Sequence, residues 1–186
     1  LHGTDITLVG KDPSYEPVVT FSINQSDGVT AVSESLKADT YEHFNVVREI
    51  DVIPNFVCLK GREKAEVDKE LKSQLAPNGE CLIAHVSNFR KVKRIPDVIE
   101  VFERIHQKIP SRLILIGDGP ERHEAEATAR AKGFGSDLLV LGKLIDTERV
   151  LSAMDLFLLP SEFESFGLAA LEAMSAGVPV ISSNTG

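Results

Sequence analysis

The sequence has few of the features that mark several classes of protein. It has only two cysteines, Cys58 and Cys81, whose positions match no metal-binding or redox spacing, so we interpret them as reduced, packed thiols. Its longest apolar runs have the length of a strand, which excludes a membrane-spanning segment, and no basic stretch followed by an apolar one opens the chain as a secretory signal. The net charge of −8 argues against nucleic acid as a partner. These observations favour a cytoplasmic protein.

What the second half does contain is a regular alternation of two patterns. Short apolar runs bounded by Gly, Pro, Ser or Asp suit strands buried on both faces of a parallel sheet, at residues 81–87, 112–117, 137–142, 155–160 and 178–182. Segments with helical spacing lie between them, at roughly 95–108, 120–132, 146–153 and 167–176. This alternation predicts a doubly wound α/β sheet, in which ligands bind beyond the carboxyl ends of the strands.

The first half is less regular and is predicted to belong to another α/β domain. We expect a helix within 13–26, a strand at 28–33, a helix at 34–44 capped by Ser33, and a strand at 48–56 that ends at Pro54. Residues 58–80 are predicted to be a helical connector followed by a turn. Because the chain begins "LHGTDIT" without methionine and stops just after an apolar strand, we expect it to be part of a longer protein.

Of the three acids in the largely apolar stretch "PSEFESFGLAALEAM" (160–174), Glu164 and Glu172 lie on either side of a Phe-Gly pair. Gly167 allows the backbone to approach a ligand, and the amides that open the following helix form a site for an anion such as phosphate. A carboxylate such as Glu164 or Glu172 accepts paired hydrogen bonds, which suits the vicinal hydroxyls of a ribose or a sugar. The alternative is that Glu172 faces solvent and Glu164 caps the helix.

The stretch "EFESFGLAALEAMSAGVPVISSNTG" resembles the signature of the retaining GT-B glycosyltransferases of family 4. In that family two Glu residues, separated by seven others, flank a Phe-Gly turn that is followed by A-x-G-x-P-V-I. The resemblance implies that Glu164 contacts the hydroxyls of the donor sugar and that Glu172 contacts the ribose. The diphosphate would then meet the backbone of Phe166, Gly167 and Leu168.

The same resemblance implies a fold of two Rossmann-like α/β domains with parallel sheets. Residues 1–57 would be the C-terminal part of the acceptor-binding domain and residues 58–80 the connector. Residues 81–186 would be the N-terminal part of the domain that binds the nucleotide-sugar donor. It also implies an enzyme, a retaining hexosyltransferase that uses a UDP-sugar.

A basic run, "SNFRKVKR" (87–94), follows the first strand of the predicted donor domain. Cations at this edge could neutralise a departing diphosphate without a metal; the alternative is a solvated charged surface. The family carries an Arg, four residues and a Lys here, so placing Lys93 at that Lys leaves Asn88 where the Arg is expected. Either Arg90 or Arg94 could supply the missing charge, and we predict Arg90 together with Lys93. No metal-ligand cluster appears at a usable spacing, and we expect no metal and no cofactor.

Two further loops follow predicted strands. "IGDGPER" (116–122) lacks the third glycine of a dinucleotide-binding loop and the Gly-Lys-Ser/Thr of a P-loop, so it predicts a tight turn with Pro120 at the first position of a helix. The resemblance places this loop beside the donor pocket and places "LGKL" (141–144) near the base. The alternative for 141–144 is an ordinary connection between a strand and a helix.

The stretches "HGTDIT", "VTAVS", "IPNF" and "HVSNFRKVKR" most resemble a bacillithiol-pathway subgroup of the family. This implies UDP-GlcNAc as donor and L-malate, a small hydroxy acid, as acceptor. It places His2 near the anomeric carbon, although a lone histidine is otherwise more often structural. Thr4 and Arg48 are the weaker candidates for binding the acceptor. Two alternatives stay open, namely another acceptor, such as a lipid or a polysaccharide, and a non-catalytic module that binds a nucleotide sugar. A homo-oligomer is compatible with the sequence.

Overall fold

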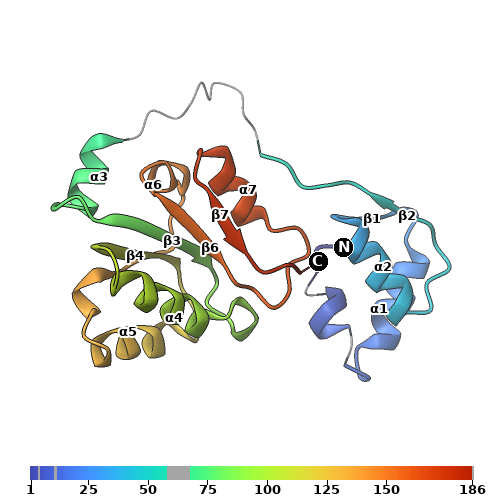
Figure 1. The fold of residues 1–186 in the computed structure, drawn as a ribbon. Helices are drawn as coiled ribbons and strands as arrows, with labels where there is room; N and C mark the ends of the chain where they lie inside the picture. Colours follow the sequence, from blue (N-terminus) through green and yellow to red (C-terminus); the bar gives the residue numbers. More distant parts are fainter. Residues whose placement is uncertain (4, 11, 58–67, 186) are drawn as a thin grey trace. The chain divides into compact units, whose positions relative to one another are not determined.

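The computed structural model describes residues 1–3, 5–10, 12–57 and 68–185 (Figure 1). By its internal contacts the chain divides into two compact units. The first comprises Leu1–Phe56 together with Phe163–Leu168, and the second comprises Val57–Glu162 together with Ala169–Thr185. Each unit contains a parallel sheet with helices, which confirms the predicted α/β class.

The first unit is built around a two-stranded parallel sheet. In chain order its elements are the π-helix η1 (Asp5–Val9), α1 (Glu16–Gln25), β1 (Val29–Ala31), α2 (Glu34–His43) and β2 (Ile50–Val52). The side chain of Ser33 accepts a hydrogen bond of 3.1 Å from the amide of Leu36, which confirms the predicted cap of α2. The predicted helices and strands are all present, whereas η1 was missed because five residues are too few to show a helical period.

The second unit is a five-stranded parallel sheet in the order β5-β4-β3-β6-β7. The five predicted strands and the four predicted helices between them are confirmed, with ends shifted by a few residues. In chain order the elements are α3 (Lys69–Leu75), β3 (Cys81–Ser87), η2 (Lys91–Lys93), α4 (Ile95–His106), β4 (Ser111–Gly117), α5 (Arg122–Ala131), η3 (Gly135–Asp137), β5 (Leu138–Gly142), α6 (Glu148–Leu151), β6 (Leu156–Leu159), α7 (Leu168–Ser175) and β7 (Val180–Ser182).

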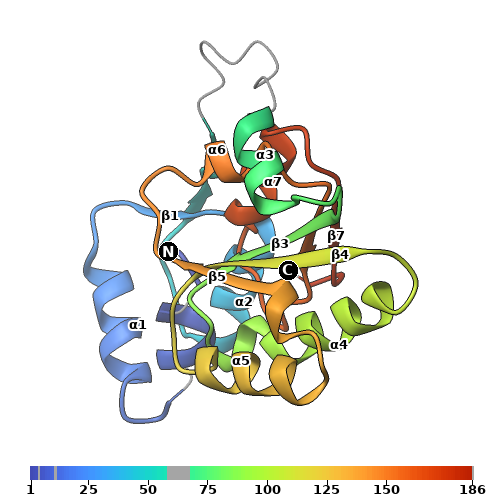
Figure 2. The ribbon, with the colours of Figure 1, turned by 90° about the vertical axis from the view of Figure 1, so that its left-hand side faces the viewer.

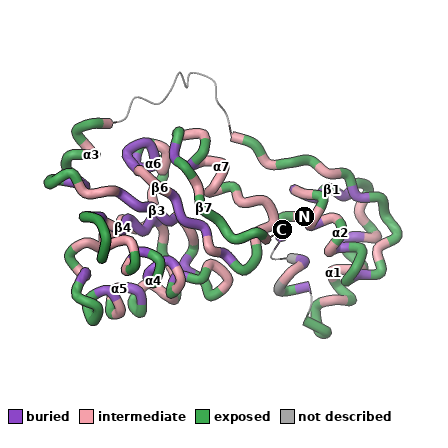
Figure 3. Tube along the Cα trace, viewed as in Figure 1, coloured by how far each residue is buried: buried purple, intermediate pink, exposed green. Residues whose placement is uncertain are grey.

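Helices cover both faces of this sheet (Figures 1 and 2). Alternate residues of a strand point to opposite faces, so Leu82 and Ala84 of β3 pack into the core under α3, α6 and α7, and Ile83 packs into the core under α4 and α5. The three inner strands β3, β4 and β6 are therefore buried from both sides, as the buried stretches of β3 and β6 show in Figure 3, whereas β5 and β7 at the two edges are more exposed. The burial explains why the strands are continuously apolar in the sequence.

One predicted helix start is wrong. Helix α5 begins at Arg122, so Pro120 lies in the preceding turn and not at the first helical position. The backbone of Glu121, with a φ of −86° and a ψ of 0°, is not helical, and its amide donates a hydrogen bond of 3.1 Å to the carbonyl of Phe89 in the neighbouring loop. This contact holds the loop against residue 89 before the helix begins. Of the predicted connector, α3 is observed, and residues 58–67 lie outside the described residues.

Candidate functional site

The strand order of the second unit indicates a ligand site at the carboxyl end of β3. Strand β3 lies between β4 and β6, so the chain reverses its direction of travel across the sheet at this strand. In such sheets the crevice at the reversal is where ligands bind. The loops that leave β3 and β6 meet there, because the amide of Glu162 donates a hydrogen bond of 2.8 Å to the carbonyl of Val92. The structure thus joins the basic run to the start of the loop that leads to Glu164.

The basic run forms a short turn at this edge, which we call the cationic turn (residues 88–94). Arg90 is exposed and Lys93 is half-buried, and the amide of Lys93 donates to the carbonyl of Arg90 at 2.7 Å. The Nε of Arg94 lies 2.6 Å from the Asp97 carboxylate, whose hydrogen bond and charge raise the pKa of Arg94. Arg94 thus has an ion-pair partner in the first turn of α4, and the choice of Arg90 as the second cation stays a prediction.

The backbone of the cationic turn is fixed by an unusual residue and by two glycines of the next loop. Phe89 is fully buried although its φ is 43°, in the region that favours glycine. A Cβ added to Gly117 would lie 1.8 Å from the carbonyl oxygen of Ser87, and one added to Gly119 would lie 1.9 Å from that of Asn88. The loop "IGDGPER" therefore supports the cationic turn through close backbone contact, a role that the sequence analysis missed.

The acid-bearing stretch has the predicted turn and helix. Gly167 has a φ of 78°, which requires glycine, and α7 begins at the next residue, Leu168. The first amides of any α-helix lack partners within the helix, which is the feature that an anion would use. Phe166 packs against the core of the first unit. Glu164 and Glu172 are both half-buried, so neither stands fully in solvent.

The first residues of the chain contact this same stretch. The hydroxyl of Ser165 donates a hydrogen bond of 2.7 Å to the carbonyl of His2, although 163 residues separate them in the sequence. A Cβ on Gly3, whose φ is 121°, would lie 2.8 Å from the Oγ of Ser165. The structure thus brings His2, whose side chain is exposed, beside the residue that follows Glu164.

Of the two residues predicted to bind the acceptor, Thr4 and Arg48, the structure describes only Arg48. Thr4 lies outside the described residues. Arg48 is exposed and precedes β2, at the amino end of that strand, and its Nε donates a hydrogen bond of 3.0 Å to the carbonyl of Asn24. This contact with the end of α1 is a sufficient structural reason for an arginine at this position. Binding of an acceptor by Arg48 remains a prediction.

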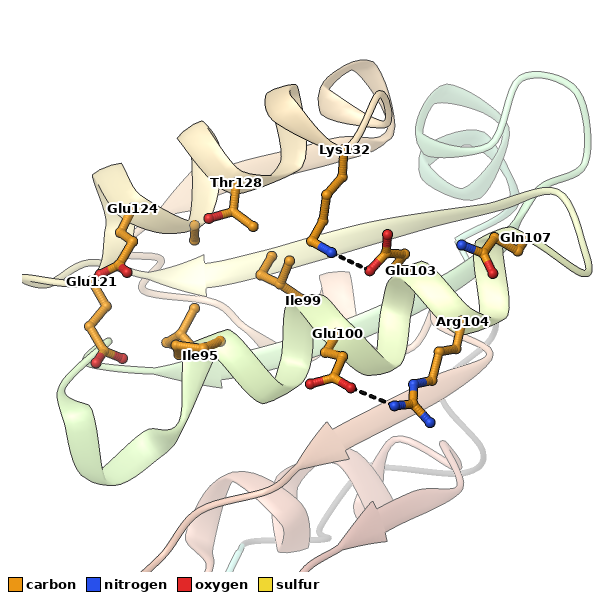
Figure 4. A pocket seen from close by; sticks show the side chains of 12 residues that line it. Ile95, Ile99, Glu100, Glu103, Arg104, Gln107, Glu121, Glu124, Thr128 and Lys132 are labelled. Carbon is orange, nitrogen blue, oxygen red and sulfur yellow. Dashed lines mark hydrogen bonds and ion pairs between the residues drawn. The ribbon is translucent and has the colours of Figure 1, made fainter.

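A groove of about 450 Å³ lies elsewhere, between α4 and α5 (Figure 4). Two cations on it are already paired, since Arg104 contacts Glu100 and Lys132 contacts Glu103, each at 2.5 Å. The groove runs along helices that cover one face of the sheet and does not lie at the carboxyl ends of the strands. We therefore do not assign the ligand site to it.

The described residues lack the patterns of a metal site and of a membrane-spanning helix. Among them, no group of three or more His, Cys, Asp or Glu side chains is arranged to hold a metal ion. Within the same ranges, no helix combines the length and the apolar character needed to cross a bilayer.

Known proteins resemble this chain along its whole length. N-acetyl-alpha-D-glucosaminyl L-malate synthase of Bacillus anthracis is 41% identical over 186 residues, which is 100% of this chain and 49% of that protein. Alpha-monoglucosyldiacylglycerol synthase of Streptococcus pneumoniae is 29% identical over 167 residues, 86% of this chain and 38% of that protein. The chain thus spans about half the length of these curated relatives or less.

A solved structure and a family model complete the comparison. The crystal structure of Anabaena Alr3699/HepE in complex with UDP and glucose matches with a TM-score of 0.89 and 22% identity, over 100% of this chain and 52% of that one. This likeness confirms the predicted GT-B fold class. The family model described as glycosyl transferases group 1 matches residues 66–186. Since the match covers more than half of the residues, the chain belongs to the family of glycosyl transferases group 1.

Proposed function

We propose that this chain is the core of a retaining, metal-independent glycosyltransferase that moves N-acetylglucosamine from UDP-GlcNAc to L-malate. The observation that carries the proposal is the cationic turn, fixed at the reversal point of the sheet and hydrogen-bonded through Val92 to the loop that leads to Glu164. Positive charge at that edge matches what a departing nucleoside diphosphate needs. Family membership and the 41% identity over the whole chain support the same assignment.

The donor would be held by three kinds of group. Arg90 and Lys93 would contact the diphosphate, together with the backbone amides of Phe166, Gly167 and Leu168 at the start of α7. The carboxylate of Glu172 would accept hydrogen bonds from the two ribose hydroxyls, and that of Glu164 from hydroxyls of the sugar. Both acids are half-buried and are therefore not freely solvated surface side chains, which supports these roles.

The chemistry proceeds at the anomeric carbon of the sugar. The bond from that carbon to the diphosphate oxygen breaks, and the negative charge that develops on the oxygen is stabilised by Arg90 and Lys93. The malate hydroxyl oxygen forms the new bond on the same face, and its proton passes to the departing diphosphate. The transition state resembles an oxocarbenium ion, and protein cations take the place of a metal. His2 would line the site beside the reacting carbon.

The acceptor is proposed from the names of two relatives. Malate is favoured because the 41% identical relative bears the name of a malate synthase. A second candidate is a lipid acceptor, which the diacylglycerol in the name of the Streptococcus pneumoniae relative favours. For malate, Thr4 and Arg48 are the proposed contacts of the acceptor. The cytoplasm, where UDP-sugars and hydroxy acids are both at hand, is the proposed location.

The test is a donor and acceptor screen on the full-length protein. UDP-GlcNAc and UDP-glucose are each supplied with L-malate, with diacylglycerol vesicles or with no acceptor, in the presence of a metal chelator. UDP release and product mass are measured, and the anomeric configuration is read by NMR. The expected product is an α-linked GlcNAc-malate. A glycolipid product would favour the second candidate, and UDP binding without turnover would overturn catalysis and favour a binding module.

A further inference from the structure

Strand β3 contains a buried histidine that the proposed chemistry does not use. His85 has no exposed surface, and its ring lies between Phe89 and Phe157, with centroids 6.4 and 6.5 Å away. Its Nδ1 lies 2.8 Å from the carbonyl oxygen of Leu158 on β6, and its Nε2 lies 2.8 Å from the hydroxyl of Ser87. The histidine thus connects β6 to the last residue of β3, directly before the cationic turn.

The carbonyl fixes the direction of the first hydrogen bond, and the protonation of the ring then sets the direction of the second. A carbonyl oxygen can only accept, so Nδ1 of His85 carries a proton and donates to Leu158. In the singly protonated ring Nε2 is then an acceptor, and the Ser87 hydroxyl donates to it. The Ser87 oxygen keeps lone pairs to accept the amide of Phe89, which lies 3.2 Å away. A series of hydrogen bonds therefore connects the Leu158 carbonyl on β6, through the His85 ring and the Ser87 hydroxyl, to the amide of Phe89.

The last residue of this series, Phe89, is one of two residues of the cationic turn, with Arg94, that have a positive φ without being glycine. Phe89 adopts a φ of 43°, which is unfavourable for a residue other than glycine, so another conformation of the turn is accessible unless contacts prevent it. Burial of the Phe89 ring and the Ser87 hydrogen bond to its amide both oppose that change. The next residue is Arg90, whose guanidinium direction depends on the backbone at 89.

We propose that His85, acting through Ser87, is a positioning residue that holds the cationic turn in the geometry required to receive the donor diphosphate. The proposal rests on the proposed function, because it assumes that Arg90 and Lys93 act on that diphosphate. His85 touches neither donor nor acceptor in this role. It sets the angle at which the turn leaves β3, and it does so only in the tautomer that accepts the Ser87 hydroxyl.

The first test removes one hydroxyl. Ser87→Ala should increase amide exchange in the peptide that covers residues 88–94 about fivefold, through loss of the Phe89 hydrogen bond. It should also lower kcat about tenfold, with KM for the donor changed by less than about twofold, because a turn displaced by a fraction of an ångström weakens the transition state more than the ground state. The matched control is Ser111→Ala, a buried serine at the amino end of β4, which should change neither quantity.

A second pair of variants separates the hydrogen bond from packing. His85→Gln keeps an acceptor near the position of Nε2, whereas His85→Asn keeps a donor near Nδ1 and loses the acceptor. His85→Asn should therefore behave like Ser87→Ala, and His85→Gln should remain closer to the wild type. Equal losses in both variants would mean that the ring acts only by filling space, and would overturn the proposal.

A double variant distinguishes this inference from the proposed function. In a Lys93→Ala, Arg90→Ala background, Ser87→Ala should have no further effect on kcat, because the groups that it positions are gone. The inference would be overturned if Ser87→Ala lowered kcat equally in the wild type and in the Lys93→Ala, Arg90→Ala background. It would also be overturned if Ser87→Ala changed neither amide exchange nor kcat. The proposed function would stand in both cases. If removing both cations leaves transfer unchanged, the proposed function is wrong, and the exchange measurement still tests whether Ser87 holds the turn.

Discussion

The close contact between Gly119 and the cationic turn leads to a sharp prediction for Gly119→Ala. Gly119 does not have a positive φ, so alanine can adopt this backbone without strain. The loss of stability would therefore come only from the collision of the new Cβ with its neighbours. The new Cβ would lie 1.9 Å from the carbonyl oxygen of Asn88, about 1.1 Å short of the 3.0 Å that real Cβ contacts respect. Since the obstacle is backbone, the two loops must move apart.

The size of the effect follows from this displacement. Overpacking of this kind costs about 1–3 kcal/mol. Separating the loops by about 1 Å also breaks the hydrogen bond from the Glu121 amide to the Phe89 carbonyl, now 3.1 Å, which adds about 1 kcal/mol. We expect the free energy of unfolding to fall by about 2–4 kcal/mol. Because the same displacement moves Arg90, kcat should fall about 10- to 100-fold.

The measurement combines denaturant unfolding with steady-state kinetics on the full-length protein. Gly28→Ala, which would meet no atom within 4 Å, should be close to neutral in both. Gly133→Ala, also free of neighbours but with a φ of 86°, should lose about 1–2 kcal/mol of stability and keep its kcat. If Gly119→Ala were as stable and as active as Gly28→Ala, the claim that this loop supports the cationic turn would be refuted.

Three further predictions follow from other contacts. Glu172→Ala should weaken UDP binding by about tenfold or more in calorimetry, through loss of hydrogen bonds to a charged group, whereas Glu124→Ala, an exposed acid on α5, should not. Lys93→Ala should lower kcat about 100-fold and change KM far less, because its charge acts on the departing diphosphate; the opposite split between kcat and KM would contradict that role. The Leu71 amide, at 2.9 Å, and then Arg149, at 2.7 Å, lower the pKa of Asp68. The ionised cap therefore stabilises α3 above about pH 4 and is lost as the pH falls through the lowered pKa, so the difference in Tm between wild type and Asp68→Asn should shrink from about pH 6 to pH 3, and a constant difference would count against this effect.

The alternation of apolar runs and helical segments predicted the second unit well, because a strand buried on both faces leaves a pattern visible in its own residues. The same holds for the Ser33 cap and for the turn at Gly167, each of which depends on a few adjacent residues. The acids and cations of the candidate site were likewise recognised from local spacing. Their roles toward a donor remain predictions.

What the sequence could not reveal depends on partners far along the chain. The contact of Gly119 with Asn88 exists only because β3 and β4 are paired, with Ser87 opposite Gly117. The partner of His85 on β6 likewise follows 73 residues later. A histidine inside the apolar run "CLIAHVS" was the one available signal, and its meaning depends on which strand lies beside it. The helix start predicted at Pro120 was also wrong, because the backbone of Glu121 is not helical, and no local residue pattern signals this.

The close contact between the loop at 88–94 and the loop at 117–121 also limits how either segment can be replaced by engineering. The turn at 88–94 cannot be exchanged by itself, because its backbone at Asn88 lies against Gly119 and the preceding residue, Ser87, lies against Gly117, so that a larger residue at either glycine would collide. A transplant that brings foreign residues to 88–94 must import the matching 117–121 segment as well. The two loops therefore form one structural unit. Chimaeras that exchange only one of them should fold and function poorly, whereas chimaeras that exchange both together should keep their fold and activity.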